Sequence, residues 1–190
     1  FRISYYLHNG KGGLQVDIPR EIELLTEASK RGNHQATYRL GLLFEDNESG
    51  MAQNLELSVK YFQLAADNGI LAAINKMGEL YLFGEVIPAN LTKAISCFTA
   101  ASEQGYGKAS YWLGRLHTDG IGQLEKDTQK AMNYYRKAIE QGYEEAREWM
   151  EQLQKNLVDE TITDIEIPQD KSDEELYNCL LYTSDAADEL

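Results

Sequence analysis

The residues that most resemble a site of chemistry are the glycines of LHNGKGG at residues 7–13. Three glycines within four positions, with Lys11 among them, are similar to a loop that holds a phosphate group. Such a loop needs a β-strand before it and a Lys-Ser or Lys-Thr pair that opens a helix after it, because backbone N–H groups and the lysine must converge on the phosphates. LHNGKGG has no such context. We therefore interpret it as a turn and not as a nucleotide site.

Other residues that could perform catalysis or bind a metal are few and scattered. None of the three histidines has a second histidine or a cysteine at the spacing of a metal-binding pair; they are His8, His34 and His117. Cys97 falls on the apolar face of a predicted helix, where we interpret it as a small hydrophobic residue rather than a nucleophile. The sequence therefore predicts a protein that is not an enzyme, with no cofactor and no metal.

The charge of the chain is concentrated at its C-terminal end. Of the net charge of −13, residues 157–190 carry −10, from 11 acidic residues and one lysine, and residues 1–156 carry −3. A nearly neutral body without a basic block argues against nucleic acid as the main partner. No apolar run has the length of a membrane span. The chain begins with Phe1 rather than Met, so we expect a fragment of a longer protein.

An internal repeat predicts the elements that position the side chains. Glycines recur at spacings of 37, 36 and 37 residues, and an alanine follows each of them four positions later. These glycines are Gly32, Gly69, Gly105 and Gly142. Each unit predicts two antiparallel amphipathic helices, A and B, because apolar residues recur at i, i+3, i+4 and i+7. The glycine would end helix B in a left-handed conformation.

A second set of glycines lies inside helix A, where glycine costs about 1 kcal/mol relative to alanine. This set is Gly41, Gly78 and Gly114. We expect the cost to be offset by the close approach of helix B, whose aromatic ring would lie against the bare glycine backbone. The rings at the matching positions are Phe62, Phe98 and Tyr135.

The combined pattern resembles the Sel-1-like repeat, a relative of the tetratricopeptide repeat with a longer turn between helices A and B. It consists of Ala-x-Tyr-x-Leu-Gly, a Gly-x-Gly turn, Lys-Ala with an aromatic residue, and a final alanine and glycine. The clearest copy is ASYWLGRLHTDGIG followed by KAMNYYRKAIEQG, whereas the turn EDNESGMAQN lacks Gly-x-Gly. The resemblance implies an all-α fold, a right-handed α/α superhelix (solenoid) of antiparallel helix pairs.

The register of the repeat predicts how the chain is divided. We expect a repeat array over residues 1–156, followed by an acidic, disordered tail over residues 157–178. The array consists of a partial unit 1–32, three units at 33–69, 70–105 and 106–142, and a charged end helix at 143–156. Residues 179–190, which contain CLLYTSDAADE, resemble a translated sequencing adaptor, and we infer no function from them.

The resemblance also implies a binding surface. In the tetratricopeptide arrangement helix A lines the concave face, and the residues that flank its Leu-Gly pair point inward. The matching residues are Tyr38, Arg39, Asn75, Lys76, Tyr111, Trp112 and Arg115, with Lys108 and Trp149 extending the row. This basic and aromatic strip would suit a peptide with acidic and apolar side chains. In the alternative interpretation, Tyr111 packs in the core and Arg39 and Lys76 are merely solvated.

The sequence thus predicts a non-catalytic adaptor or scaffold that binds peptide or protein partners on the concave face. The alternative is an accessory repeat segment of a larger enzyme or of an endoplasmic-reticulum quality-control complex. The compartment stays open between the cytoplasm, which we favour, and the endoplasmic-reticulum lumen. If the strip binds a partner, charge reversal of Arg39 and Lys76 together is expected to weaken that binding and leave the array folded.

Overall fold

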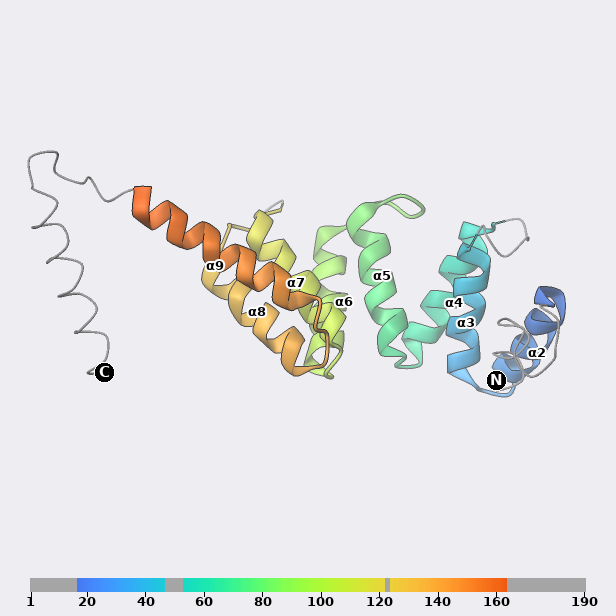
Figure 1. Cartoon of the computed structure of the whole chain (residues 1–190). Coiled ribbons are helices and arrows are strands. Elements are labelled where there is room, and N and C mark those ends of the chain that lie inside the picture. Colours follow the sequence, from blue (N-terminus) through green and yellow to red (C-terminus); the bar gives the residue numbers. More distant parts are fainter. Residues whose placement is uncertain (1–16, 47–52, 122–123, 164–190) are drawn as a thin grey trace, which may run out of the picture. The chain divides into compact units, whose positions relative to one another are not determined.

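The computed structural model describes residues 17–46, 53–121 and 124–163, and this part of the chain contains eight α-helices and no β-strand (Figure 1). The helices are α2 (Ile18–Lys30), α3 (His34–Glu45), α4 (Leu55–Asp67), α5 (Leu71–Phe83), α6 (Leu91–Glu103), α7 (Gly107–Asp119), α8 (Thr128–Glu140) and α9 (Ala146–Thr163). The LHNGKGG segment, residues 47–52 of the EDNESGMAQN turn and residues 164–190 lie outside the described residues.

Short polar side chains begin five of these helices. In each case the side-chain oxygen accepts a hydrogen bond from the backbone N–H three residues later, which satisfies one of the free donors at the helix start. The capping residues are Asp17, Asn33, Asn54, Asn90 and Asp127. Helices α5 and α7 begin without such a bond. These two helices are helices A of the repeat, and they must be held mainly by packing.

The helices pack in chain order, each against the one before and the one after it from α2 to α8. The most extensive contacts lie within the pairs α3/α4, α5/α6 and α7/α8, which are the A and B helices of the three predicted units. The predicted all-α stack of antiparallel helix pairs is confirmed. Its core is a series of small clusters between neighbouring helices, not one central core.

The predicted glycine ends of the B helices are confirmed. The φ angles at these four positions lie between 78° and 89°, in the left-handed region where a side chain is unfavourable. They belong to Gly32, Gly69, Gly105 and Gly142. A single residue separates each of Gly32, Gly69 and Gly105 from the start of the next helix A, whereas three residues separate Gly142 from the start of α9.

The glycines inside helices A lie against aromatic rings, as the repeat predicts. A Cβ atom added to Gly78 would lie 2.6 Å from Cε1 of Phe98, and one added to Gly41 would lie 2.6 Å from Cδ1 of Phe62. At Gly114 the same distance separates the added Cβ from Cε1 of Tyr135. The three rings are fully buried. The absence of a side chain is thus what allows helices A and B of one unit to pack this closely.

The last described helix is longer than the end helix that the sequence predicts. Helix α9 continues to Thr163, seven residues beyond the predicted boundary at Asn156. No glycine or proline interrupts residues 143–163, so the backbone can remain helical where the composition already turns acidic. A first compact unit ends at Leu153, and the rest of α9 belongs to a second unit. The remainder of the predicted tail lies outside the described residues.

A search of the described helices for membrane spans gives a negative result. None of them is both long enough and apolar enough to cross a bilayer.

Candidate functional site

The residues of the predicted strip lie on helices A and on the last helix. Tyr38 and Arg39 lie on α3, Asn75 and Lys76 on α5, Tyr111, Trp112 and Arg115 on α7, and Trp149 on α9. Their positive charges are paired within the protein. Arg39 Nε lies 3.4 Å from Glu21 Oε1 of α2, and Arg115 Nη2 lies 3.6 Å from Asp119 Oδ2. The strip is therefore compensated in charge and is not a row of free cations.

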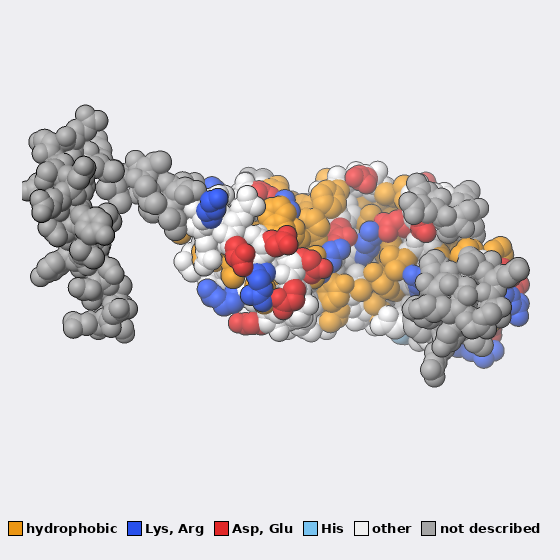
Figure 2. Space-filling view, in the orientation of Figure 1, with side chains coloured by type: hydrophobic (Ala, Val, Ile, Leu, Met, Phe, Trp, Pro, Cys, Tyr) orange, Lys and Arg blue, Asp and Glu red, His pale blue; other side chains and the backbone are white. Residues whose placement is uncertain are grey.

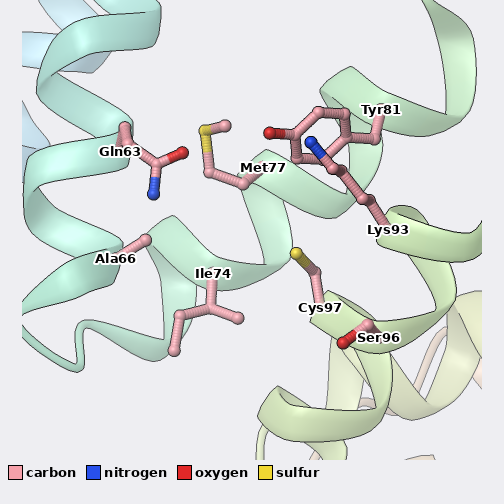
Figure 3. Close-up of a pocket in the computed structure, with 8 residues that line it drawn as sticks. All are labelled: Gln63, Ala66, Ile74, Met77, Tyr81, Lys93, Ser96 and Cys97. Carbon is pink, nitrogen blue, oxygen red and sulfur yellow. The ribbon is translucent and has the colours of Figure 1, made fainter. Parts of the chain in front are cut away.

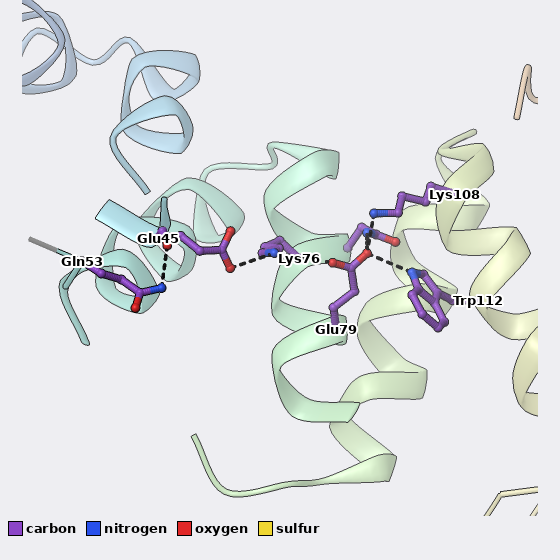
Figure 4. Close-up of polar contacts among 7 residues, drawn as sticks. Glu45, Gln53, Lys76, Glu79, Lys108 and Trp112 are labelled. Atoms are coloured by element: carbon purple, nitrogen blue, oxygen red, sulfur yellow. Dashed lines mark hydrogen bonds and ion pairs between the residues drawn. The ribbon is translucent and has the colours of Figure 1, made fainter. Parts of the chain in front are cut away.

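Glu79 on α5 is the centre of the polar contacts (Figure 4). Its side chain is nearly buried, with an exposed fraction of 9%. Its Oε1 accepts hydrogen bonds from Asn75 Nδ2 at 3.0 Å and from Trp112 Nε1 at 2.9 Å. The same oxygen lies 2.7 Å from Lys108 Nζ, and Oε2 lies 3.8 Å from Lys76 Nζ. We call these five residues the Glu79 cluster. It joins α5 to α7, and its donors stabilise a carboxylate that would be costly to bury alone.

Lys76 connects the Glu79 cluster to α3. Its Nζ lies 2.8 Å from Glu45 Oε1, so that Glu45, Lys76, Glu79 and Lys108 form an alternating row of charges across three helices A (Figure 4). Burial of the Lys108 ammonium acts to lower its pKa, but the hydrogen bond and the charge of Glu79 outweigh this effect. The pKa of Lys108 is therefore raised. Lys108 therefore remains charged at neutral pH.

The C-terminal part of the strip is an aromatic cluster. Tyr111 is 9% exposed, and its ring lies 5.6 Å from that of Trp112 and 6.2 Å from that of Trp149. Its hydroxyl accepts a hydrogen bond from Arg115 Nη1 at 3.1 Å, and the guanidinium of Arg115 lies 4.0 Å above the Trp149 ring. The low exposure of Tyr111 agrees with the alternative interpretation, in which this residue packs in the core. Trp149 is 39% exposed and can contact a partner.

Tyr38 lies close to the acidic residues of the row. Its ring lies 5.7 Å from that of Phe62, and its burial is the main reason why the pKa of Tyr38 is raised to about 12. The phenol of Tyr106 and the negative charges of Glu79 and Glu45 contribute in the same direction, because each disfavours a second negative charge. Tyr38 therefore stays neutral at pH values where an ordinary tyrosine ionises.

The raised pKa predicts an alkaline loss of stability that depends on Tyr38. Between the ordinary value of 10.0 and about 12, the unfolded chain loses the phenolic proton and the folded protein keeps it. The contribution of neutral Tyr38 to the free energy of unfolding is therefore fully present below pH 10 and falls as the pH rises through this window. In Tyr38→Phe, the free energy of unfolding in urea should fall less between pH 9.5 and pH 11.5, values set on either side of the lower limit of this window. Equal losses in both proteins would contradict a raised pKa at this residue.

Three carboxylates of this region were missed by the prediction from sequence. They are Glu21, Glu45 and Glu79. One local signal could have found Glu79, because it follows Lys76 at i+3, where the two side chains lie on the same helix face. No local signal marks Glu21 as the partner of Arg39, because 18 residues separate them in the sequence.

An apolar opening of about 220 Å³ lies between α4, α5 and α6. Figure 3 shows Ile74, Met77, Tyr81 and Cys97 around it, with Lys93 beside Tyr81. Cys97 is half-buried rather than fully buried. Burial raises the pKa of its thiol although the charge of Lys93 acts to lower it. A nucleophilic cysteine requires the opposite shift, so this surface offers no activated thiol.

The other described side chains that could act in catalysis do not gather into a site. Within the described residues, no group of three or more histidine, cysteine or acidic side chains could hold a metal ion. The His117 ring stacks on that of Tyr134 at 5.6 Å, and burial lowers the pKa of His117. His8 lies outside the described residues. The arrangement of charged and aromatic side chains on helices A is suited to binding another macromolecule.

Solved structures share this fold. A Sel1 repeat protein from Oxalobacter formigenes superposes with a TM-score of 0.72 at 26% identity, over 78% of this chain and 60% of that chain. The protective antigen c5321 of uropathogenic Escherichia coli superposes with a TM-score of 0.70 at 20% identity, over 78% of this chain and 32% of that one. At this identity the second likeness shows the fold alone.

Curated relatives are much longer proteins. The chitin synthase regulator SKT5 of Malassezia restricta is 32% identical over 111 residues, which are 57% of this chain and 8% of that protein. Protein sel-1 homolog 2 of Homo sapiens is 41% identical over 69 residues, which are 36% of this chain and 10% of that protein. The chain therefore spans about a tenth of the length of these relatives or less.

Four consecutive segments of the chain match the Sel1 repeat, at residues 1–33, 34–70, 71–106 and 107–143. Their ends lie one residue beyond those of the units that the glycine register predicts. The stacked helix pairs, the solved structures of the same fold and these four matches agree. The chain belongs to the Sel1 repeat family.

Proposed function

We propose that this chain is the interaction module of a non-catalytic adaptor or scaffold, and that it binds a protein or peptide on the surface formed by α3, α5, α7 and α9. Sel1-repeat proteins are generally scaffolds for protein interactions. A stack of helices serves this purpose because its length supplies a continuous surface to which successive units contribute side chains.

The observation that supports this surface is the position of the exposed large apolar side chains. Among the described residues of the first compact unit, three of the four lie on or next to helices A and the last helix: Phe83 ends α5 and is 58% exposed, Ile121 follows α7 and is 40% exposed, and Trp149 on α9 is 39% exposed. Figure 2 shows hydrophobic side chains gathered over the middle helices, with acidic and basic side chains among them. Exposed aromatic and aliphatic residues bordered by charges are typical of protein-binding surfaces.

Site-specific crosslinking tests this assignment without disturbing the charge row. Charge reversal of Arg39 and Lys76 is unsuitable, because the new carboxylates would face Glu21, which is fully buried, and Glu45. A photoreactive benzophenone amino acid should instead replace Ile121 in one variant of the full chain and Leu64 of α4 in a matched control, since both side chains are exposed.

Irradiation in an extract of the source cells should give a specific protein adduct at position 121 and none at position 64. An excess of the unlabelled chain should compete the adduct away, because binding to a defined surface is saturable. Adducts at position 64 alone would place the binding surface on the B helices. The absence of a competable adduct at both positions would contradict the interaction function itself.

A second candidate function is an accessory repeat segment of a larger enzyme or of an endoplasmic-reticulum quality-control complex. It is favoured by the length of the curated relatives, of which this chain spans a tenth or less, and by the name of one of them as a regulator of chitin synthase. The full-length coding sequence distinguishes the two candidates, because only the second requires a catalytic or complex-forming domain in the same polypeptide.

A further inference from the structure

Two adjoining pockets lie at the C-terminal ends of α5 and α7, and Phe83 forms part of both. The first, which we call the acidic pocket, has a volume of about 270 Å³ and is lined by Glu45, Lys76, Glu79, Leu80, Phe83 and Glu85. The second, which we call the apolar pocket, has a volume of about 210 Å³, and its apolar lining consists of Leu82, Phe83, Trp112, Leu116 and Ile121. The ion pair of Arg115 and Asp119 borders the apolar pocket.

The apolar pocket has a fixed wall and an exposed edge. The Trp112 ring is stacked on the buried ring of Phe98 at 5.9 Å, and its Nε1 donates to Glu79, so two contacts hold its orientation. Phe83 stands edge-on to Trp112, with ring centroids 5.6 Å apart, and is the most exposed large apolar residue of the described part. Such a pre-ordered aromatic wall suits one bulky apolar side chain of a partner, because little ordering entropy is lost on binding.

The acidic pocket carries an excess of negative charge. Its lining holds three glutamates and one lysine. Lys76 is already engaged by Glu45 at 2.8 Å and by Glu79 at 3.8 Å. Glu85 is exposed and forms no ion pair with any residue in the described ranges. A cationic side chain would therefore find an available carboxylate there, whereas an anionic one would be repelled.

We propose that the two pockets together bind a peptide segment in which a lysine or arginine stands close to a bulky apolar residue. The cation would enter the acidic pocket beside Glu85, and the apolar side chain would lie against Phe83 and Trp112 in the apolar pocket. This proposal rests on the proposed interaction function and specifies the partner. Its charge is opposite to that expected from the strip in the sequence, because internal carboxylates neutralise the cations of the strip.

The proposal can be tested by selecting peptides that bind the full chain from a displayed library of random 12-residue peptides. The library sets this length, and an extended peptide of about 12 residues is long enough to span two pockets. The peptides selected should share a lysine or arginine near a leucine, phenylalanine or tryptophan. Their dissociation constants should then be measured by fluorescence anisotropy for two variants, Phe83→Ser and Glu85→Lys. The matched controls are Leu64→Ser, which alters another exposed apolar residue, and Glu103→Lys, which alters an exposed glutamate on α6.

We expect Phe83→Ser to weaken binding about tenfold or more, since it removes the shared apolar wall. Glu85→Lys should weaken binding by roughly threefold to tenfold at low salt, and the difference should shrink at high salt because the site is exposed. Both controls should leave the dissociation constant unchanged. Circular dichroism should show all four variants folded, because the altered side chains are exposed.

Three outcomes would overturn the proposal: enrichment of acidic peptides, equal affinities for the wild type and both pocket variants, or selection of no peptide at all. A competable adduct at position 121 in the crosslinking experiment would still support the interaction function in any of these cases. The absence of a competable adduct at both positions 121 and 64 would contradict the interaction function directly, so the two failures can be told apart.

Discussion

Phe98→Ala should lower the free energy of unfolding by about 3–5 kcal/mol. The Phe98 ring is fully buried in the cluster that α6 forms with α7, and it also lies against the bare backbone of Gly78 in α5. Its removal leaves a cavity between three helices that cannot all move inward at once. Urea unfolding followed by circular dichroism measures the loss, and Phe98→Leu, which retains part of the volume, should lose less.

Combining Phe98→Ala with Gly78→Ala tests whether the two residues interact. In the wild type, Gly78→Ala should destabilise, because its Cβ would lie 2.6 Å from Cε1 of Phe98, and overpacking of about 1–3 kcal/mol exceeds the gain of about 1 kcal/mol in helix propensity. In the Phe98→Ala background the ring is absent, so Gly78→Ala should stabilise by up to about 1 kcal/mol. The effect of Gly78→Ala thus changes sign with the partner.

Gly105→Ala is the matched control for this cycle. Gly105 has a φ of 89°, and a Cβ there would have no atom within 4 Å. Its replacement should destabilise through backbone strain of about 1–2 kcal/mol, and by the same amount in both backgrounds. Stabilisation by Gly78→Ala in the wild type would contradict the close approach of α5 and α6 at this glycine.

The packing of glycine against an aromatic ring could be predicted from sequence because both partners recur in the same register. Gly78 and Phe98 are repeated as Gly41 with Phe62 and as Gly114 with Tyr135, so each unit repeats the same evidence. Glycine lowers helix stability at each of these equivalent positions, so the same structural reason must apply in every unit. The helix ends at the positive-φ glycines could be predicted on the same ground.

The contacts of the binding surface could not be predicted in this way because they are not repeated. Glu79 stands one residue after Gly78, but the equivalent positions after Gly41 and Gly114 hold Leu42 and Arg115. Its contact with Trp112 joins residues 33 apart in the sequence, and no local pattern specifies such a pair. The sequence therefore predicted which helices carry the polar and aromatic residues, but not that carboxylates neutralise the lysines among them.

The end of the array shows the same limit. Composition places the start of the tail at residue 157, because acidic residues become frequent there. Glycine and proline are the strong helix breakers, and neither occurs between residues 157 and 163, so α9 continues to Thr163. A change in charge composition alone does not define the end of a helix.

Glu79→Ala should destabilise the protein by about 2–4 kcal/mol. This loss is larger than the one expected for Glu45, the other carboxylate of the charge row. Its removal leaves the Nδ2 of buried Asn75 and the Nε1 of Trp112 without an acceptor, and the half-buried ammonium of Lys108 without its counter-charge. Glu45→Ala is the matched control. Glu45 makes one ion pair and is 29% exposed, so it should cost about 1 kcal/mol or less.

Glu79→Gln separates the loss of charge from the loss of hydrogen bonding. It retains one oxygen acceptor, so it should cost less than Glu79→Ala at neutral pH, and its cost should depend on the protonation of Lys108. The pKa of Lys108 is raised above 10.5 in the folded protein, so the pairing contribution is fully present below that value and is lost as the pH rises through the folded pKa. The difference in free energy of unfolding between the wild type and Glu79→Gln should therefore be constant from neutral pH to about pH 9 and should narrow above the ordinary pKa of lysine. Urea titrations at a series of pH values measure it. A difference that stays constant through the alkaline range would mean that Glu79 acts as a hydrogen-bond acceptor alone, and not as the counter-charge that holds α5 to α7.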